Sequence, residues 1–119
     1  MKKVYYLSTC STSKRIITEL NLKELGFEFQ DIKFDSITPV QLSEMEDMVG
    51  TYEGLFSKIA RKYKELGLKD KSLSEDDFKT YILSEYTFLK RPVIIAEDQI
   101  FIGNSKKVVQ AANDFLNQG

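Results

Sequence analysis

Residues 4–13, Val-Tyr-Tyr-Leu-Ser-Thr-Cys-Ser-Thr-Ser, decide the fold, because a strand, a loop and a helix start follow one another there. The first four residues are β-branched, aromatic or aliphatic, which is typical of a strand. The next six include five Ser or Thr residues, the types that cap helix N-termini. Cys10, the single cysteine of the chain, therefore stands where the first helix is predicted to begin.

The segment that follows completes a β-α-β unit. Apolar residues recur at helical spacing from Ser13 onward and Gly26 is a stop signal, which predicts a helix over residues 13–25. Phenylalanines and Ile32 alternate imperfectly with polar residues over 27–34, which predicts a second strand. Strands joined through a helix need a crossover connection, so we expect these two to be parallel.

The middle of the chain is predicted to be helical. Thr38-Pro39-Val40-Gln41 forms a capping box with Pro at the first helical position, and the helix is expected to end near Gly50. A second helix is predicted over 55–66, followed by Gly67, and a third from a Ser74 cap through about residue 83. These three helices form an inserted segment of about residues 38–88.

The last third returns to strands. Arg91-Pro92 precedes the apolar run 93–96, and Glu97-Asp98 separates it from 99–103, which predicts a β-hairpin. Apolar residues over 108–116 predict a closing amphipathic helix. The order β-α-β, helices, β-β-α predicts an α/β, thioredoxin-like fold with a mixed four-stranded sheet. We expect one domain over residues 1–119 that contains the helical insertion.

Composition excludes several classes of partner. The 119 residues carry 17 Lys and Arg against 18 Asp and Glu, so no net field steers the protein toward nucleic acid or an anionic membrane. No apolar run approaches the roughly 20 residues of a membrane span, and the start has too short an apolar stretch for a signal peptide. We expect a cytoplasmic protein that binds neither nucleic acid nor membrane directly.

Two residue counts limit the chemistry. The chain has no His and one Cys, which excludes Ser-His-Asp and Cys-His catalysis, an imidazole metal site and an internal disulfide. We therefore predict no metal site and no bound cofactor. Redox work by Cys10 would need a thiol from another molecule, such as glutathione, glutaredoxin, thioredoxin or a second copy of the chain.

The position of Cys10 favours a reactive thiol. Unpaired amides and the positive end of the helix dipole favour the thiolate there and lower its pKa. The same amides, the hydroxyls of Ser11, Thr12 and Ser13 and the ammonium of Lys14 could hold an oxyanion beside the sulfur. The alternative is a cysteine that only fills space where a strand enters a helix, because Cys is among the most buried residue types.

Two motifs together resemble the arsenate-reductase-like family of the thioredoxin-like superfamily, over essentially the whole chain. They are Cys10-Ser11-Thr12-Ser13-Lys14 after a strand, and Leu89-Lys90-Arg91-Pro92-Val93-Ile94-Ile95 at the start of the hairpin. The resemblance implies that Cys10 is the catalytic nucleophile and that Pro92 is cis and packs beside it. It also implies that Arg91 binds substrate, where a guanidinium can grip an oxyanion with two hydrogen bonds. The alternative role for Arg91 is a surface ion pair.

The chain departs from arsenate reductases proper at two further arginines, which the family places on an inserted helix and after the last hairpin. The matching places here hold Ser57-Lys58, with Arg61 one turn later, and Asn104-Ser105-Lys106. The end of the hairpin is closer to the Spx-like branch, but that branch commonly has Cys-x-x-Cys, and Ser13 stands at the second position.

Two functions are therefore predicted as alternatives. The first is a thiol-dependent reductase that acts on a small oxyanion or a mixed disulfide, with glutathione, glutaredoxin or thioredoxin as partner. The second is an Spx-like module that docks on RNA polymerase or another protein without catalysis.

Overall fold

A four-stranded mixed sheet lies at the centre of the first of two units in the computed structural model, which describes residues 1–118. This unit combines Met1–Asp35 with the chain from Arg91 onward, and the second unit is Ser36–Lys90. The second unit coincides closely with the predicted insertion. That the whole chain forms one domain stays a prediction. Within the described residues, no helix has the length and apolar character needed to cross a membrane.

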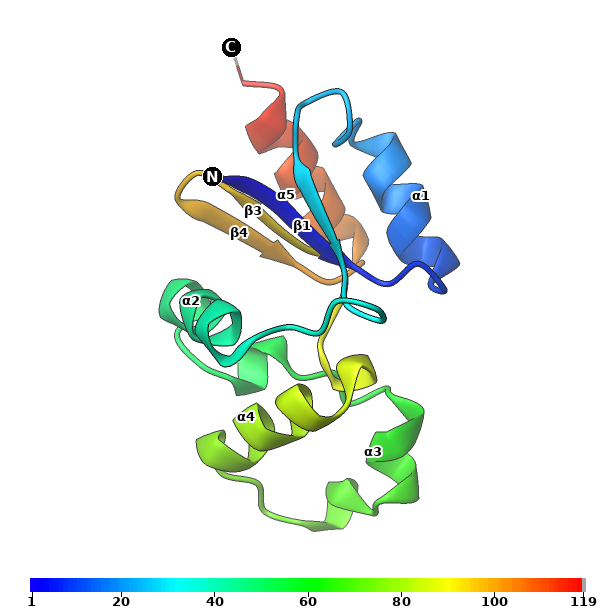
Figure 1. The fold of residues 1–119 in the computed structure, drawn as a ribbon, viewed down its shortest axis with the longest axis vertical. Helices are drawn as coiled ribbons and strands as arrows, with labels where there is room; N and C mark the ends of the chain where they lie inside the picture. Colours follow the sequence, from blue (N-terminus) through cyan, green and yellow to red (C-terminus); the bar gives the residue numbers. More distant parts are fainter. Residues whose placement is uncertain (119) are drawn as a thin grey trace. The chain divides into compact units, whose positions relative to one another are not determined.

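The strands are β1 (Lys2–Tyr6), β2 (Glu28–Asp31), β3 (Val93–Ala96) and β4 (Gln99–Ile102), in the spatial order β2-β1-β3-β4 (Figure 1). β1 and β2 are parallel, whereas β3 is antiparallel to both β1 and β4. The prediction of a mixed thioredoxin-like sheet is confirmed. The register of the sheet sets Tyr5 opposite Val93, so the chain beyond β1 leaves the sheet at the end where β3 begins.

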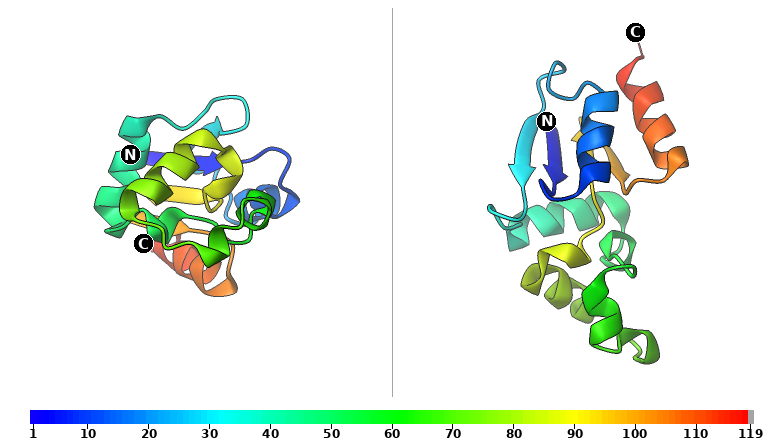
Figure 2. Two further views of the ribbon diagram at one scale, coloured as in Figure 1. Left: turned by 90° about the horizontal axis from the view of Figure 1, so that it is seen from below. Right: turned by 90° about the vertical axis from the view of Figure 1, so that its right-hand side faces the viewer.

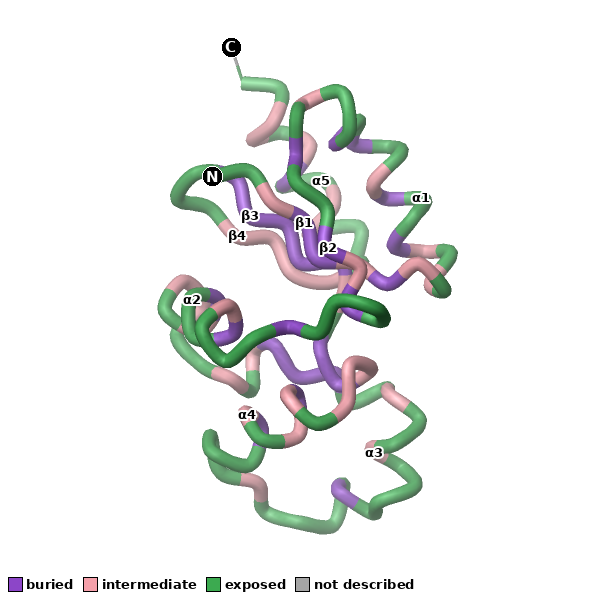
Figure 3. Tube along the Cα trace, viewed as in Figure 1, coloured by how far each residue is buried: buried purple, intermediate pink, exposed green. Residues whose placement is uncertain are grey.

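Helices α1 (Ser11–Glu19) and α5 (Lys106–Leu116) cover one face of this sheet (Figures 1 and 2). The core between them is apolar and almost completely buried (Figure 3). Its buried members come from β1, α1, the loop after α1, β3 and α5: Val4, Ile16, Leu20, Leu22, Phe27, Ile94, Ala96 and Ala112. This packing holds α1, and with it the start of the helix at Cys10, against the sheet.

The helix predicted over 13–25 is shorter than expected, because α1 ends at Glu19. Asn21 adopts a left-handed conformation with φ 53°, which a helix cannot continue and which Asn tolerates better than most residues. Leu22 and Leu25 still contact the core, but from a turn. The strand predicted over 27–34 is likewise shorter, since β2 spans only Glu28–Asp31.

The second unit contains the helices α2 (Pro39–Val49), α3 (Arg61–Glu65) and α4 (Glu75–Ser84) and three short 3₁₀ helices, Glu53–Leu55, Leu68–Asp70 and Tyr86–Phe88. Both predicted caps are confirmed. Thr38 and Gln41 form a capping box at α2, and Ser74 and Asp77 form one at α4. Gly50 ends α2 with φ 102°, a left-handed value that favours glycine.

The helix predicted over 55–66 is wrong for its first half. Phe56 pairs with Leu89 in an isolated antiparallel bridge. The Ser57 amide donates to the Phe88 carbonyl at 2.7 Å, and the Lys90 amide donates to the Leu55 carbonyl at 2.8 Å. These long-range bonds occupy backbone groups that an α-helix would need, so the α-helix begins only at Arg61.

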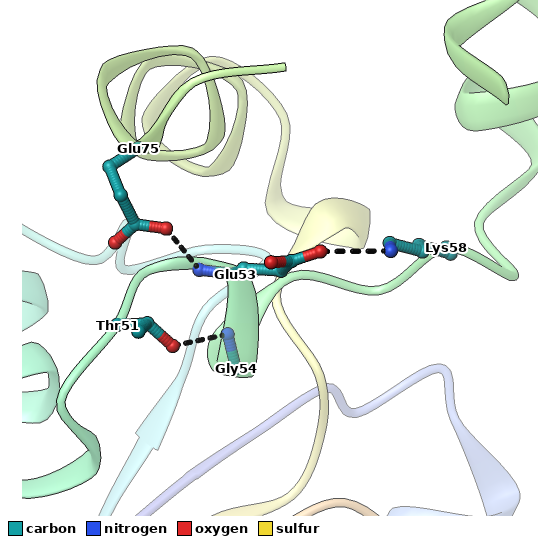
Figure 4. Close-up of polar contacts among 5 residues, drawn as sticks. All are labelled: Thr51, Glu53, Gly54, Lys58 and Glu75. Carbon is teal, nitrogen blue, oxygen red and sulfur yellow. Dashed lines mark hydrogen bonds and ion pairs between the residues drawn. The ribbon is translucent and has the colours of Figure 1, made fainter. Parts of the chain in front are cut away.

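Glu75 of α4 fastens the turn that precedes this bridge (Figure 4). Its two carboxylate oxygens accept hydrogen bonds from the amides of Tyr52, at 2.7 Å, and Glu53, at 3.3 Å. In the same turn the Thr51 hydroxyl accepts from the Gly54 amide at 3.0 Å. The carboxylate thereby satisfies amides at the start of a 3₁₀ helix that have no partner within that helix.

Replacing Ser74 with Ala is expected to lower the free energy of unfolding by about 1 kcal/mol, because the α4 cap is lost. The Ser74 hydroxyl accepts from the Asp77 amide at 3.2 Å, and the Asp77 carboxylate accepts from the Ser74 amide at 2.9 Å. Urea denaturation measures the change. Ser72→Ala, at an exposed loop position two residues earlier, is the matched control and should change stability by less than about 0.5 kcal/mol.

Candidate active site around Cys10

The loop after β1 places Cys10 at the N-terminus of α1. The Cys10 amide donates to the Leu7 carbonyl at 2.9 Å and closes a tight turn, and the Lys14 amide donates to the Cys10 carbonyl at 3.2 Å as the first helical bond. Cys10 is thus the N-cap residue of α1. Its thiol is partly exposed, unlike that of a cysteine that only fills space in a core.

Of the four residues predicted to surround the thiol from the helix, one is buried and three reach the surface. Ser11 and Lys14 are exposed and Thr12 is half-buried, whereas Ser13 is completely buried. The Ser13 hydroxyl acts on the Cys10 thiol through a hydrogen bond and has no other hydrogen-bond partner among residues 1–118. A buried hydroxyl is costly without a hydrogen bond, so its bond to the thiol also satisfies Ser13 itself.

Arg91 reaches the same thiol from the other end of the unit's sequence. It immediately precedes Pro92 and β3, and the Arg91–Pro92 peptide bond is cis, the isomer that the resemblance implies. Pairing of β1 with β3 brings the chain at Arg91 toward the loop that leaves β1. The guanidinium is close enough to Cys10 to act on it through its charge and a hydrogen bond.

These neighbours lower the pKa of the Cys10 thiol. Partial burial on its own raises the pKa, because it disfavours the charged thiolate. Hydrogen bonding from the Ser13 side chain and amide, followed by the charge and hydrogen bond of Arg91, outweighs that effect. The folded state therefore holds more thiolate at neutral pH than an ordinary cysteine would, and thiolate is the nucleophilic form.

Asp31 is a residue of this region that the sequence analysis did not single out. It ends β2, and its Oδ1 accepts from the amides of Ser8 and Lys33, each at 3.2 Å. Ser8 belongs to the turn that carries Cys10. The signal that could have found Asp31 is the parallel β-α-β unit itself, because the carboxyl ends of parallel neighbours lie at one edge of the sheet.

The pKa of Asp31 is lowered too. Slight burial raises it, but hydrogen bonding from the Ser8 side chain and from the Lys33 and Ser8 amides, together with the charge of Lys33, outweighs that effect. A carboxyl whose pKa falls on folding stabilises the folded state above its ordinary pKa of about 4. This contribution is lost as the pH falls through the lowered pKa.

Three exposed cations stand near the places where the family has its further arginines: Lys58, Arg61 and Lys106. Lys58 is engaged by Glu53 of its own unit, with 3.0 Å between Nζ and the carboxylate oxygen (Figure 4). Arg61 begins α3, also in the second unit. Lys106 is the first residue of α5 in the sheet-containing unit. Within the sheet-containing unit, the cation that acts on the Cys10 thiol is Arg91.

Known proteins similar to this chain include arsenate reductases and an Spx regulator. A model of the ArsC family matches residues 5–112. An arsenate reductase of Neisseria meningitidis is 26% identical over 114 residues, 92% of this chain and 95% of the relative. The global transcriptional regulator Spx of Lactococcus lactis is 22% identical over 112 residues, 93% and 85% of the two chains. A solved structure of a putative arsenate reductase from Yersinia pestis has the same fold, with TM-score 0.78, 18% identity and coverage of 93% and 99%.

Proposed function

Because the chain belongs to the ArsC family, we propose that it is a thiol-dependent oxidoreductase that uses the Cys10 thiolate as nucleophile and an external thiol as reductant. The single observation that carries the proposal is the placement of Cys10, which is partly exposed at the N-terminus of α1 with Ser13 and Arg91 acting on its thiol. A thiolate that is partly exposed and activated in this way can attack an oxidised centre.

The proposed roles are those that a helix N-terminus and a nearby guanidinium suit. The α1 amides, the hydroxyls of Ser11, Thr12 and Ser13 and the Lys14 ammonium favour an anion next to the sulfur. The Arg91 guanidinium supplies the fixed positive charge and two parallel donors that suit an oxyanion. Ser13 supplies a buried hydroxyl that hydrogen-bonds to the thiol and favours its thiolate form.

Each candidate reaction balances with external thiols. With arsenate, the thiolate displaces an arsenate oxygen as water and forms a sulfur–arsenic bond. An external thiol then attacks the Cys10 sulfur, and arsenite leaves with the electron pair. The resulting mixed disulfide is reduced by a second external thiol, so two thiols supply the two electrons. With a mixed-disulfide substrate, the thiolate attacks one sulfur, the other leaves as a thiolate, and one external thiol restores Cys10.

If the thiol pKa is low and arsenate is not reduced, a mixed disulfide becomes the leading substrate class. A highly charged oxyanion transition state needs several cations around it. Arg91 is the one that acts on the thiol, and Lys58 is engaged by Glu53. Thiol–disulfide exchange carries less charge and depends mainly on the thiolate and on access to it.

The test begins with the rate of Cys10 alkylation by iodoacetamide across pH, which is unambiguous because the chain has one thiol. We expect a midpoint below the ordinary value of about 8.5. Arg91→Ala should move this midpoint upward, because a positive charge that favours the thiolate is removed. Arg15→Ala is the matched control, since this Arg faces Glu19 on the exposed side of α1, 3.6 Å away.

Turnover is then assayed with glutathione and glutaredoxin, first on arsenate and then on a glutathionylated peptide. A low midpoint with turnover on either substrate supports the enzyme, and turnover on the peptide alone identifies the disulfide as the substrate class. An ordinary midpoint without turnover contradicts the proposal.

The alternative is a docking module without catalysis, and the Spx relative is the observation that favours it. In that function Cys10 would be modulatory, and Ser13 in place of a second cysteine excludes a disulfide switch inside the chain. Co-purification with RNA polymerase, unchanged in a Cys10→Ser variant, together with an absence of turnover, would favour the module over the enzyme.

A further inference from the structure

We infer that Asp31 is a positioning residue for the thiol, holding the turn that carries Cys10 against the end of β2. The inference rests on the proposed function, for which the placement of the thiolate matters. It rests on geometry that joins two segments more than twenty residues apart. Asp31 acts through the backbone of the loop, because its carboxylate accepts the Ser8 amide.

The bond between Asp31 and Ser8 is the first step of the argument. Ser8 is an inner residue of the turn that the Cys10 amide closes on the Leu7 carbonyl at 2.9 Å. The Ser8 amide donates to Asp31 Oδ1 at 3.2 Å. The turn is therefore held by its own closing bond and by this bond to β2. Freed from this acceptor, the Ser8 amide would turn to water, and the backbone that orients the thiol would gain freedom.

Asp31 is itself held firmly, which is the second step. Its side chain also accepts the Lys33 amide at 3.2 Å, and its carbonyl accepts the Asp35 amide at 2.9 Å. The Ile32 amide donates to the Tyr6 carbonyl at 2.9 Å and extends the pairing of β2 with β1. A carboxylate fixed by its own loop in this way can fix a neighbouring loop in turn.

The charge of Asp31 and its hold on the loop would change the pKa of the Cys10 thiol in opposite directions, which makes the inference testable. A carboxylate acting on Cys10 through its charge would raise the pKa of the thiol, so removing it would lower that pKa. A carboxylate that holds the loop keeps the sulfur in line with the Ser13 and Arg91 donors, so removing it would raise the pKa toward the ordinary value. The direction of the change therefore distinguishes the two.

The experiment measures the pKa of Cys10 in Asp31→Ala, Asp31→Asn and Asp35→Asn by alkylation rate and by thiolate absorbance, without any substrate. We expect Asp31→Ala to raise the pKa by about 0.5, an approximately threefold loss of thiolate reactivity at neutral pH. Asp31→Asn keeps an acceptor oxygen and should restore most of the wild-type value. Asp35→Asn removes the same charge from the same loop and should leave the pKa of the thiol at the wild-type value.

A pKa at or below wild type in Asp31→Ala overturns the inference, as does an equal rise in Asp35→Asn. An Asn variant as impaired as the Ala variant overturns the role of the acceptor oxygen. Circular dichroism and urea denaturation show whether each variant is folded, and the Asn variant keeps the test decisive if Asp31→Ala does not fold. Because no turnover is measured, a wild type with a low thiol pKa but no activity refutes the proposed function and leaves this inference intact.

Discussion

Cys10→Ser is expected to abolish reductase turnover, with a loss of more than about 10³-fold on every substrate that the wild type accepts. The chain has one thiol, so no second cysteine can take over the attack. A serine hydroxyl in the same place is a far weaker nucleophile, and the chain contains no His that could activate it. Steady-state rates with glutathione and glutaredoxin measure the effect.

The same variant provides its own control for folding. Cys10 is the N-cap of α1 and makes no side-chain capping hydrogen bond, whereas Ser is a favoured N-cap residue. The free energy of unfolding of Cys10→Ser should therefore equal or exceed that of the wild type. Turnover that survives the substitution would show that the thiol is not the nucleophile and would contradict the proposed function.

Phe56→Ala is expected to lower the free energy of unfolding by about 3–5 kcal/mol, the largest stability effect that we predict. Phe56 is 1% exposed and stacks on Phe88, with ring centroids 5.0 Å apart. Phe78 lies 4.9 Å from it and Tyr63 5.9 Å, both measured between ring centroids. Truncation removes the ring that these three share and leaves a cavity in the centre of the second unit.

Urea denaturation followed by circular dichroism measures this change. The matched control is Phe34→Ala, because Phe34 is 79% exposed and loses little contact when truncated. We expect a change of less than about 0.5 kcal/mol for the control. A loss below about 1 kcal/mol for Phe56→Ala would mean that the aromatic cluster does not hold the unit together.

Local signals were sufficient wherever a structure is held by bonds between neighbours in sequence. The capping boxes at Thr38 and Ser74 predicted α2 and α4, because both bonds of each box join residues three apart. The hairpin of β3 and β4 followed from two apolar runs around Glu97-Asp98. The start of α1 at Cys10 followed from the Ser and Thr residues around it.

Prediction failed where distant residues compete for the same backbone. The apolar spacing over 55–66 is helical, yet the backbone of residues 55–57 bonds to residues 88–90 instead. The spacing over 13–25 is helical too, but Asn21 turns the chain so that Leu22 enters the core from outside a helix. The spacing of apolar residues does not distinguish a helix from the bridge or turn observed here, because each of them buries the same side chains.

The amino-acid order alone determined that this protein has one thiol, that the thiol begins a helix and that no internal partner can oxidise it. Ser13 acts on that thiol from the same helix start, and only the tertiary structure decided how distant residues reach it. Arg91 acts on it because β3 pairs with β1, and Asp31 reaches Ser8 because β2 lies parallel to β1. Strand pairing brings together residues that lie tens of positions apart, and the pKa of a group depends on such neighbours in space.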